Sequence, residues 1–377
     1  MLYFDNAATT FRKPRIVYKK ALRYYKYYNA NAGRGQHYLS LKATEMINNT
    51  ATELLTFLKF GNNCKVVFTP SATISLNMIL QGLDFSNIKN VYISPFEHNA
   101  VLRVLYFLQR KHKFTINILK VSKDSLKFDF NDIKQQFMKN EPNLLVISHI
   151  SNVFGIIAPI KELFSLSKQY ECINVVDMSQ SASLLDIDMT SVDFDFAVFA
   201  GHKTLYAFQG VAGIIHKNKI KLNPIIFGGT GINSKDKDMP KELTLPGTAN
   251  ILSIASLHYS LQYLKRLGLS KIERKERQKT KLLKDILSKF DNLQIICNND
   301  DCISIISCIV KGVAVDDMAA ILNKYKICVR AGIHCSPLAH EFSRTPNGTL
   351  RFSTSLFNKK SDFSRLKSKL NIIFKHI

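Results

Sequence analysis

Several features that would assign a function at once are missing from this sequence. No run of about 18 apolar residues is present, which argues against a membrane-spanning helix. No pair among the seven cysteines has C-x-x-C spacing, which argues against a zinc ribbon and a thioredoxin-type redox pair. The phosphate-loop motif G-x-x-x-x-G-K-S/T and the serine-hydrolase motif G-x-S-x-G are also absent. The sequence therefore gives no support for these five classes of protein.

The sequence is also poor in acidic residues and contains no tryptophan. Its 52 lysines and arginines against 29 aspartates and glutamates give a net charge of +23, a balance that suits nucleic acids, acidic partners or anionic substrates. The cations are spread thinly, as in Lys19-Lys20 and Lys359-Lys360, and no dense basic stripe interleaves with aromatic residues. We therefore do not expect a direct nucleic-acid function. A skewed genome composition explains the charge equally well.

The cysteines are scattered along the chain, and the default for each is a small buried hydrophobe. The first residues, Met1-Leu2-Tyr3, lack the basic start and the apolar stretch of a signal peptide. Scattered cysteines in a chain without a secretion signal are typical of a reducing compartment. We expect a cytoplasmic protein that does not bind a membrane.

The order of apolar runs and amphipathic stretches predicts the fold class. Nearly continuous apolar strands alternate with helical patterns up to residue 216, which predicts an α/β domain with a mostly parallel central sheet covered on both faces. After residue 250 two helical stretches come in succession, and strands and helices follow, which predicts a smaller C-terminal α+β domain. We divide the chain into an N-terminal segment (1–14) that packs with the small domain, a large domain (15–248) and the small domain (249–377). The predicted strands of the large domain are 65–69, 90–94, 114–121, 143–149, 173–177, 194–199 and 211–216.

Polar residues follow the predicted strands at the sheet edge where open α/β sheets bind their ligands. Hydroxyls, two amides, two acids, two histidines and a lysine suit an aldehyde cofactor, although each residue alone could be a helix cap or a turn residue. Such a cofactor needs a lysine to bond it covalently, an acid opposite its pyridine nitrogen and an anion site for its phosphate. The polar residues at this edge are Ser71, Thr73, Glu97, His98, Ser151, Asn152, Asp177, Gln180, His202 and Lys203.

A series of short motifs runs over essentially the whole chain. The motifs are Phe4-Asp5-Asn6-Ala7-Ala8-Thr9-Thr10, Arg34-Gly35-Gln36-His37, Ser71-Ala72-Thr73, Glu97-His98-Asn99, Ser151-Asn152-Val153, Val176-Asp177 with Gln180, Gly201-His202-Lys203, Gly228-Gly229-Thr230-Gly231, Gly247-Thr248, Arg330-Ala331-Gly332-Ile333-His334-Cys335 and Leu350-Arg351-Phe352-Ser353. With these motifs in this order, the chain resembles the class V aminotransferase superfamily, and within it the cysteine desulfurases of the short-loop subgroup. The resemblance implies the PLP-dependent transferase fold of type I, with pyridoxal 5'-phosphate (PLP) as the cofactor.

The resemblance assigns roles to several of these residues. Lys203 is expected to bond PLP covalently and, once substrate frees it, to shuttle a proton, which requires a lowered pKa. Asp177 would keep the pyridine nitrogen protonated, although an aspartate after a strand is also a common helix N-cap. Gln180 and Asn152 would hydrogen-bond the ring oxygen, and Asn152 would also meet the substrate carboxylate. His98 would stack on the ring and take part in proton transfer.

The phosphate site follows from the same resemblance. Ala72 and Thr73 begin a predicted helix whose free N–H groups and dipole suit an anion, and His202 adds a donor. Thr248 would reach the phosphate that the other subunit binds, which implies a homodimer.

Three departures from the family pattern bear on PLP affinity. Ala200 stands where the family usually has Ser or Thr, Ala207-Phe208 replace a Gly-Pro, and Leu245 replaces a Glu. The loss of one hydroxyl–phosphate hydrogen bond would cost on the order of 1–3 kcal/mol. A cofactor that is also held covalently tolerates such a loss.

Cys335 decides which reaction is expected. It lies in a turn-like segment flanked by Arg330 and Arg344, and nearby cations favour the thiolate. In the resemblance this thiol attacks the sulfur of L-cysteine, leaves a persulfide on the enzyme and releases L-alanine, and the sulfur then passes to an acceptor in a pathway such as iron–sulfur cluster assembly. Arg351 would clamp the substrate carboxylate with its two-pronged guanidinium. His37 and Arg330 look like further substrate-binding residues at the entrance of the site.

Two alternatives stay open at this point. The first is another PLP reaction on the same scaffold, such as selenocysteine lysis or transamination, and transamination needs no thiol. The second is a catalytically inactive homologue that binds polyanions or serves as a scaffold. The joint presence of Lys203, Asp177, Cys335 and Arg351 favours the desulfurase over the inactive protein.

Overall fold

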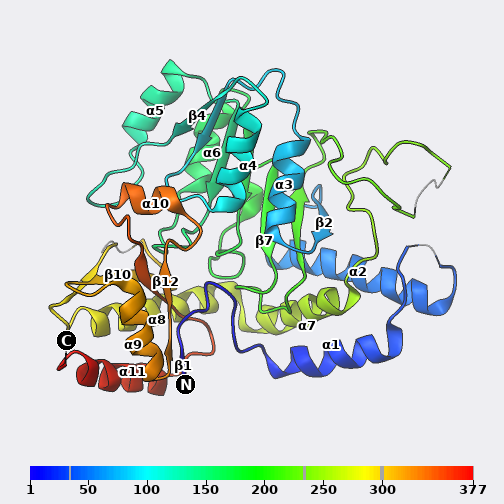
Figure 1. Ribbon diagram of the computed structural model, residues 1–377. Helices are drawn as coiled ribbons and strands as arrows, with labels where there is room; N and C mark the ends of the chain where they lie inside the picture. Colours follow the sequence, from blue (N-terminus) through cyan, green and yellow to red (C-terminus); the bar gives the residue numbers. More distant parts are fainter. Residues whose placement is uncertain (34, 232–234, 298–300, 377) are drawn as a thin grey trace.

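A seven-stranded sheet forms the centre of the computed structural model, which describes residues 1–33, 35–231, 235–297 and 301–376 (Figure 1). Arg34 of the quoted motifs lies outside these ranges. The strand order is β2-β8-β7-β6-β5-β3-β4, and every neighbouring pair is parallel except those of β8, which runs antiparallel to β2 and β7. The predicted mostly parallel sheet is therefore confirmed. The strands are β2 (Lys65–Thr69), β3 (Asn90–Ile93), β4 (Thr115–Ile118), β5 (Leu144–Ser148), β6 (Ile173–Asp177), β7 (Phe196–Ala200) and β8 (Ala212–His216).

Helices cover both faces of this sheet, which explains why its central strands are apolar along their whole length. On one face, α3 (Ala72–Gly82) and α4 (Asn99–Gln109) pack their apolar stripes against the strands. On the other face lie α5 (Phe130–Lys139) and α6 (Ile160–Lys168), whose Phe137 and Phe164 are fully buried. A short 3-10 helix, Met189–Ser191, precedes β7. The two layers of helices fix the strand ends that carry the polar residues.

Three helices form a platform below the sheet. α1 (Arg15–Tyr28) and α2 (Tyr38–Phe57) both pack against α7 (Ile251–Leu267), which the sequence analysis assigns to the small domain (Figure 1). The exposed surface of α1 interleaves aromatic and basic side chains, such as Tyr18 and Tyr25 with Lys19 and Arg23. The expectation that no basic stripe interleaves with aromatic residues is therefore wrong for this helix, whose sequence Tyr18–Tyr28 alternates the two kinds of side chain.

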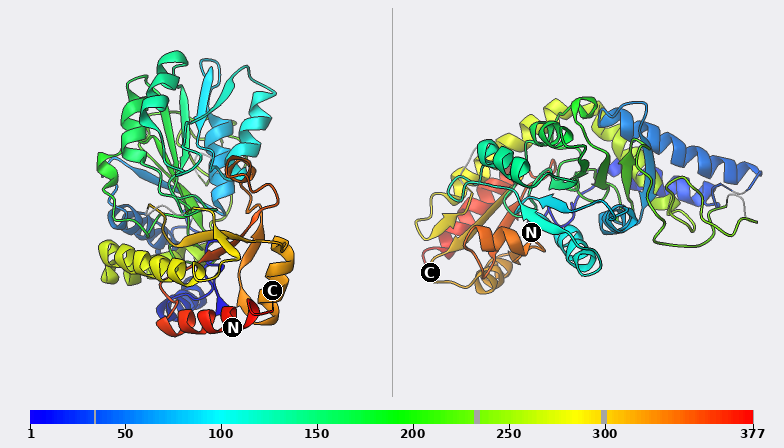
Figure 2. Two further views of the ribbon diagram at one scale, coloured as in Figure 1. Left: turned by 90° about the vertical axis from the view of Figure 1, so that its left-hand side faces the viewer. Right: turned by 90° about the horizontal axis from the view of Figure 1, so that it is seen from above.

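The small domain is an antiparallel sheet with helices, as predicted. Its strand order is β12-β13-β10-β9, and Figure 2 shows it at the opposite end of the molecule from α1 and α2. Among the described residues no helix of the chain is long and apolar enough to cross a membrane. The elements are α8 (Leu269–Leu287), β9 (Leu293–Ile295), β10 (Ile305–Val310), α9 (Val315–Lys324), β11 (Ile327–Cys328), β12 (Arg330–Gly332), α10 (Pro337–Phe342), β13 (Thr349–Ser353) and α11 (Lys360–Ile373).

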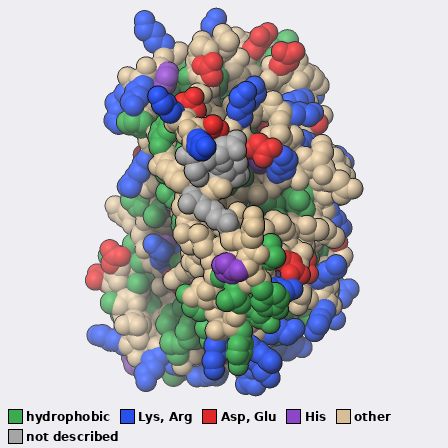
Figure 3. Space-filling view, turned by 90° about the vertical axis from the view of Figure 1, so that its right-hand side faces the viewer, with side chains coloured by type: hydrophobic (Ala, Val, Ile, Leu, Met, Phe, Trp, Pro, Cys, Tyr) green, Lys and Arg blue, Asp and Glu red, His purple; other side chains and the backbone are tan. Residues whose placement is uncertain are grey.

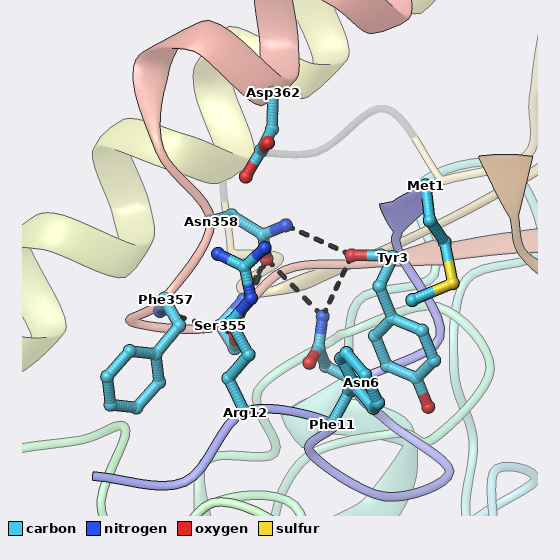
Figure 4. Close-up of a pocket in the computed structure, with 9 residues that line it drawn as sticks. All are labelled: Met1, Tyr3, Asn6, Phe11, Arg12, Ser355, Phe357, Asn358 and Asp362. Carbon is cyan, nitrogen blue, oxygen red and sulfur yellow. Dashed lines mark hydrogen bonds between the residues drawn. The ribbon is translucent and has the colours of Figure 1, made fainter. Parts of the chain in front are cut away.

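Residues 2–6 pack against β11, β13 and α11. Strand β1 (Leu2–Tyr3) pairs in parallel with β11, and the Phe4 ring contacts the rings of Phe352 and Phe363 at centroid distances of 6.4 and 5.6 Å. The Asn6 amide donates to the main-chain oxygen of Ser353 at 3.0 Å. It also donates to the side-chain oxygen of Asn358 at 3.3 Å, a contact visible in Figure 4. These contacts direct the following residues toward the edge of the central sheet.

Candidate active site

A cavity of about 110 Å³ lies beyond the carboxyl ends of β5, β6 and β7, where the first turns of α3 and α4 also meet. This is the position that the parallel sheet predicts for a ligand. Ser148 and Ser179 also line the cavity, although neither was among the predicted site residues. The predicted site residues that line it are Ala72, Thr73, His98, Asn152, Asp177, Gln180, His202 and Lys203.

Lys203 follows β7 through a tight turn. A side chain at Gly201 would place its Cβ 2.7 Å from the Val211 carbonyl oxygen, so only glycine fits there. Burial lowers the pKa of Lys203 to about 8, because removal from water disfavours the ammonium, while the charge of Asp177 opposes this shift. A larger share of the amine is therefore neutral and nucleophilic near neutral pH than in an exposed lysine.

Asp177 and Gln180 lie at the end of β6 and in the turn after it. The Asp177 carboxylate is buried and accepts a hydrogen bond from the Ser179 backbone N–H at 2.8 Å, so it also caps its turn. The Gln180 amide donates to the Ala7 carbonyl oxygen at 2.9 Å, which ties it to the N-terminal segment. Both residues line the cavity, and the structure thus brings the acid and the lysine to one pocket.

His98 and the first turn of α3 form another wall of the cavity. The His98 Nδ1 accepts from the Ala100 N–H at 3.0 Å and caps α4, so a neutral His98 ring carries its proton on Nε2. Burial and the nearby Lys203 lower the pKa of His98 to about 4, which keeps the ring neutral. Ser71 caps α3 by accepting from Ile74 N–H at 3.3 Å. The preceding N–H groups of this helix point to where an anion would bind.

His202 faces the cavity beside the lysine. Its Nδ1 lies 3.1 Å from the Thr9 hydroxyl. Burial, followed by the charges of Lys203 and Lys13, lowers the pKa of His202 to about 4. A neutral imidazole here can donate one hydrogen bond to an anion but brings no charge of its own.

The Cys335 loop closes the cavity from the side of the small domain. The loop is held by Asn152, whose amide donates to the His334 carbonyl at 2.7 Å and accepts from the Ser336 hydroxyl at 2.8 Å. The Cys335 carbonyl accepts from the Asn99 N–H at 2.7 Å. Both polar atoms of the Asn152 amide therefore bond to the cysteine loop, one on each side of Cys335. This contact was not predicted from the sequence.

Cys335 itself is exposed at the mouth of the site. His334 and Cys335 have φ angles of 52° and 61°, a left-handed turn that side chains rarely adopt. Cys335 lines an outer groove of about 560 Å³ that shares Thr73 and His98 with the inner cavity. The thiol therefore lies in a groove that adjoins the cavity lined by Lys203.

Arg351 on β13 is buried with an incomplete set of partners. It donates to the Asn152 carbonyl at 2.8 Å and to the Asp5 carboxylate at 3.1 Å, and its Nε has no partner among the described residues. Arg330 is its neighbour across the strand pair β12–β13. An unsatisfied buried guanidinium donor favours a ligand with acceptor oxygens, such as a carboxylate.

His37 and Thr248 do not line the cavity of the single chain. His37 is exposed and caps α2, where its Nδ1 accepts from the Ser40 N–H at 3.4 Å. Thr248 is exposed in the segment before α7. The expectation that Thr248 serves the site of another subunit stays a prediction, as does the role of His37.

The departures at residues 200 and 207–208 leave the pocket intact. Ala200 lies in the cavity wall, where a methyl group stands in place of the usual hydroxyl. The Ala207 N–H donates to the Gly201 carbonyl at 2.8 Å, and the Phe208 N–H donates to the Ser256 hydroxyl at 2.8 Å. The loop after the lysine is thus held without the usual Gly-Pro. A partly buried lysine, a buried acid, a neutral histidine and a helix N-terminus fit an aldehyde phosphate cofactor, whereas the described residues hold no cluster of metal ligands.

Comparison with known proteins agrees with this geometry. The family model "Aminotransferase class-V" matches residues 2–366. The chain belongs to the class-V aminotransferase family. The members of this family use PLP, which confirms the predicted cofactor and the predicted fold class.

Individual class-V relatives are distant but cover nearly the whole chain. A probable cysteine desulfurase of Pyrococcus abyssi is 29% identical over 395 residues, which cover 100% of this chain and 95% of the relative. A cysteine desulfurase of Wigglesworthia glossinidia brevipalpis is 27% identical over 392 residues, which cover 99% and 92%. The apo structure of a cysteine desulfurase from Thermococcus onnurineus NA1 superimposes with a TM-score of 0.90 at 26% identity and covers 100% and 95%.

Proposed function

We propose that this class-V chain is a PLP-dependent cysteine desulfurase, which converts L-cysteine to L-alanine and holds the sulfur as a persulfide on Cys335. One observation supports the proposal most strongly: an exposed thiol lies in a groove that adjoins a cavity lined by a partly buried lysine and a buried acid. An aminotransferase needs the lysine and the acid but has no use for the thiol. The names of the relatives support the same activity.

Different residues of the chain have different roles in this reaction. When bound, PLP supplies an electron sink that weakens the bonds at the α-carbon of the amino acid. Asp177, which lines the cavity, would hold a proton at the pyridine nitrogen. Arg351, whose buried Nε has no partner among the described residues, would hold the substrate carboxylate. Lys203, with its pKa lowered to about 8, accepts and returns a proton near neutral pH.

Cys335 is the nucleophile in the sulfur-transfer step. Its Sγ forms a bond to the substrate sulfur while the carbon–sulfur bond of the substrate breaks. The electron pair of that bond stays with the substrate carbon, which takes up a proton and leaves as the methyl group of alanine. The left-handed turn at His334 and Cys335 exposes the thiol, which allows it both to reach the cavity and to deliver the persulfide to an acceptor. The acceptor is a protein or pathway that requires sulfur, such as iron–sulfur cluster assembly, and the compartment is the cytoplasm.

A homodimer completes the proposal. Figure 3 shows apolar and basic side chains together on the face that carries the ends of α1 and α2. The side chains of Leu22, Tyr27, Tyr38, Leu41 and Phe227 are each more than half exposed. A second copy on this side would cover them and would bring exposed residues such as Thr248 and His37 toward a site that they do not reach in their own chain.

A spectrum of the purified protein with PLP, followed by addition of L-cysteine, tests the function. We expect a visible absorbance band that the Lys203→Ala variant lacks, and alanine and protein-bound sulfur in equal amounts in a first turnover. Absence of the band even after added PLP, together with binding to a polyanion at moderate salt, would favour the inactive alternative. A band with alanine-dependent amino transfer and no sulfur release would favour an aminotransferase.

A further inference from the structure

Glu97 is a fully buried carboxyl group to which the proposed reaction gives no role. It precedes His98 and has no exposed surface. Its Oε1 accepts from the Ser94 hydroxyl at 2.6 Å and from the Ser148 N–H at 2.8 Å, and its Oε2 lies 2.7 Å from the Ser148 hydroxyl. No lysine, arginine or histidine among the described residues forms an ion pair with it. A buried carboxyl group that is held by serines alone is costly to ionise.

Ser148 connects this carboxyl group to the cavity. It ends β5, and its Cα is paired in register with that of Asp177 on the neighbouring parallel strand β6. Side chains at paired positions of adjacent strands point to the same face, with the strands about 4.8 Å apart. Ser148 also lines the cavity beside Asp177. A single hydroxyl therefore separates Glu97 from the cavity wall next to the acid that faces the pyridine nitrogen.

The charge state of Glu97 sets the direction of this hydroxyl. An ionised carboxylate only accepts, so Ser148 must donate to Oε2 and turn its lone pairs toward the cavity. A protonated Glu97 can donate from Oε2 to Ser148, which frees the serine proton to point into the cavity. Burial, with a smaller contribution from the charge of Asp177, raises the pKa of Glu97 to about 7, while the hydrogen bonds from Ser94 and Ser148 oppose the shift, so both states are accessible near neutral pH.

We propose that Glu97 is a positioning residue of the PLP site, which acts through Ser148 to add a second negative charge behind Asp177 and so strengthens the hold on the pyridine proton. Two carboxylates near one protonated nitrogen stabilise that proton more than one does. The inference rests on the proposed PLP chemistry but not on the sulfur step. It concerns the strength of the electron sink rather than the choice of substrate.

The test loads PLP labelled with ¹⁵N in the pyridine ring into the full chain and follows the nitrogen resonance against pH. In Glu97→Gln the pH at which half of the ring nitrogen has lost its proton should fall by about one unit, which corresponds to a tenfold weaker hold. Ser148→Ala keeps the Glu97 carboxyl group but removes the hydroxyl that donates to it, which favours neutral Glu97. The pH at which half of the ring nitrogen has lost its proton should therefore also fall in this variant. Ser167→Ala, at another buried serine whose hydroxyl bonds to Asn174 near the start of β6 and which does not line the cavity, should keep the wild-type midpoint.

The outcomes separate this inference from the proposed function. Equal midpoints for wild type, Glu97→Gln and Ser148→Ala would overturn it. A fall in Glu97→Gln without a fall in Ser148→Ala would overturn the part assigned to Ser148. If Glu97→Gln does not fold, the Ser148→Ala midpoint alone decides. Production of alanine and sulfur by the wild type tests the desulfurase assignment independently. If the wild type has this activity and the variants have unshifted midpoints, only the role of Glu97 is refuted.

Discussion

The ammonium of Lys13 lies 2.7 Å from the main-chain carbonyl oxygen of His202, the residue before Lys203. The same oxygen accepts from the Thr10 hydroxyl at 3.1 Å and lies 3.3 Å from that of Thr9. The N-terminal segment therefore holds the peptide that presents the lysine to the cavity. Because this segment also carries Asp5, which bonds to Arg351, it joins the lysine of one domain to the arginine of the other.

Replacing Lys13 with Met should slow the attachment of PLP. The variant loses the amine donor to the His202 carbonyl, so the turn that positions Lys203 becomes less fixed, and a hydrogen bond contributes about 0.5–1.5 kcal/mol. We expect the visible band to appear about tenfold more slowly after mixing with PLP, measured by stopped-flow absorbance. Lys19→Met, at an exposed position of α1, is the matched control and should behave as wild type. Equal rates in both variants would contradict the role of Lys13.

Lys13 should also give the stability a dependence on pH. Burial lowers its pKa to about 7 in the folded chain, whereas an unfolded lysine has a pKa of about 10.4. Between these values the unfolded chain binds a proton that the folded chain does not, so the free energy of unfolding from this group rises with pH, by at most about 1.4 kcal/mol per unit. Below the folded pKa the group is charged in both states and the dependence vanishes.

Chemical denaturation of wild type and Lys13→Met at pH values of about 6, 8 and 9 measures this effect. We expect the free energy of unfolding of the wild type, minus that of Lys13→Met, to increase between about pH 8 and about pH 9. A constant difference would mean that Lys13 keeps its proton in the folded chain throughout.

Cys335→Ala should separate sulfur transfer from cofactor binding. The thiol lies in the outer groove and does not line the inner cavity, so the visible band should remain at wild-type intensity. Sulfide release from L-cysteine should fall below detection because the nucleophile is gone. Cys328→Ala, on β11, is the control. Sulfide release at the wild-type rate would reject the persulfide route, and retained release of selenide from L-selenocysteine would favour the selenocysteine lyase alternative.

Arg351→Lys should weaken substrate binding more than turnover. Lysine keeps the charge but cannot replace the two-pronged contacts that Arg351 makes with Asn152 and Asp5, nor its Nε donor. We expect KM for L-cysteine to rise about 10- to 100-fold, equivalent to about 1.5–3 kcal/mol, with a smaller change in kcat. Steady-state alanine production provides both constants. An unchanged KM would show that the carboxylate binds elsewhere.

Ala200→Ser should tighten PLP binding. The methyl group of Ala200 lines the cavity, and a hydroxyl there would add one hydrogen bond to the phosphate, about 1 kcal/mol or several-fold in affinity. Dialysis followed by measurement of the remaining visible absorbance would show slower loss of PLP. Ala197→Ser places the same hydroxyl earlier in β7 in the buried core, and it should gain nothing.

The elements of the large domain and the order of the site residues follow from local sequence. β2 and β6 have the predicted bounds, and the other strands agree within a few residues, because their apolar runs are short and flanked by polar residues or turns. Lys203 and Asp177 could be found because parallel strands place their carboxyl ends at one edge. The helices α1 and α2 were not named, although Val17, Ala21 and Tyr24 already show helical spacing.

By itself the sequence determined which functional groups are available for chemistry. The amine of a lysine, the carboxylate of an aspartate, the guanidinium of an arginine and the thiol of a cysteine are present whatever the fold. Only the tertiary structure decided how they are held. Lys13 and His202 are 189 residues apart, and Asn152 and the His334 carbonyl are 182 apart, so no local pattern could pair them. The burial that lowers the pKa of Lys203 and raises that of Glu97 likewise exists only when distant segments exclude water from both.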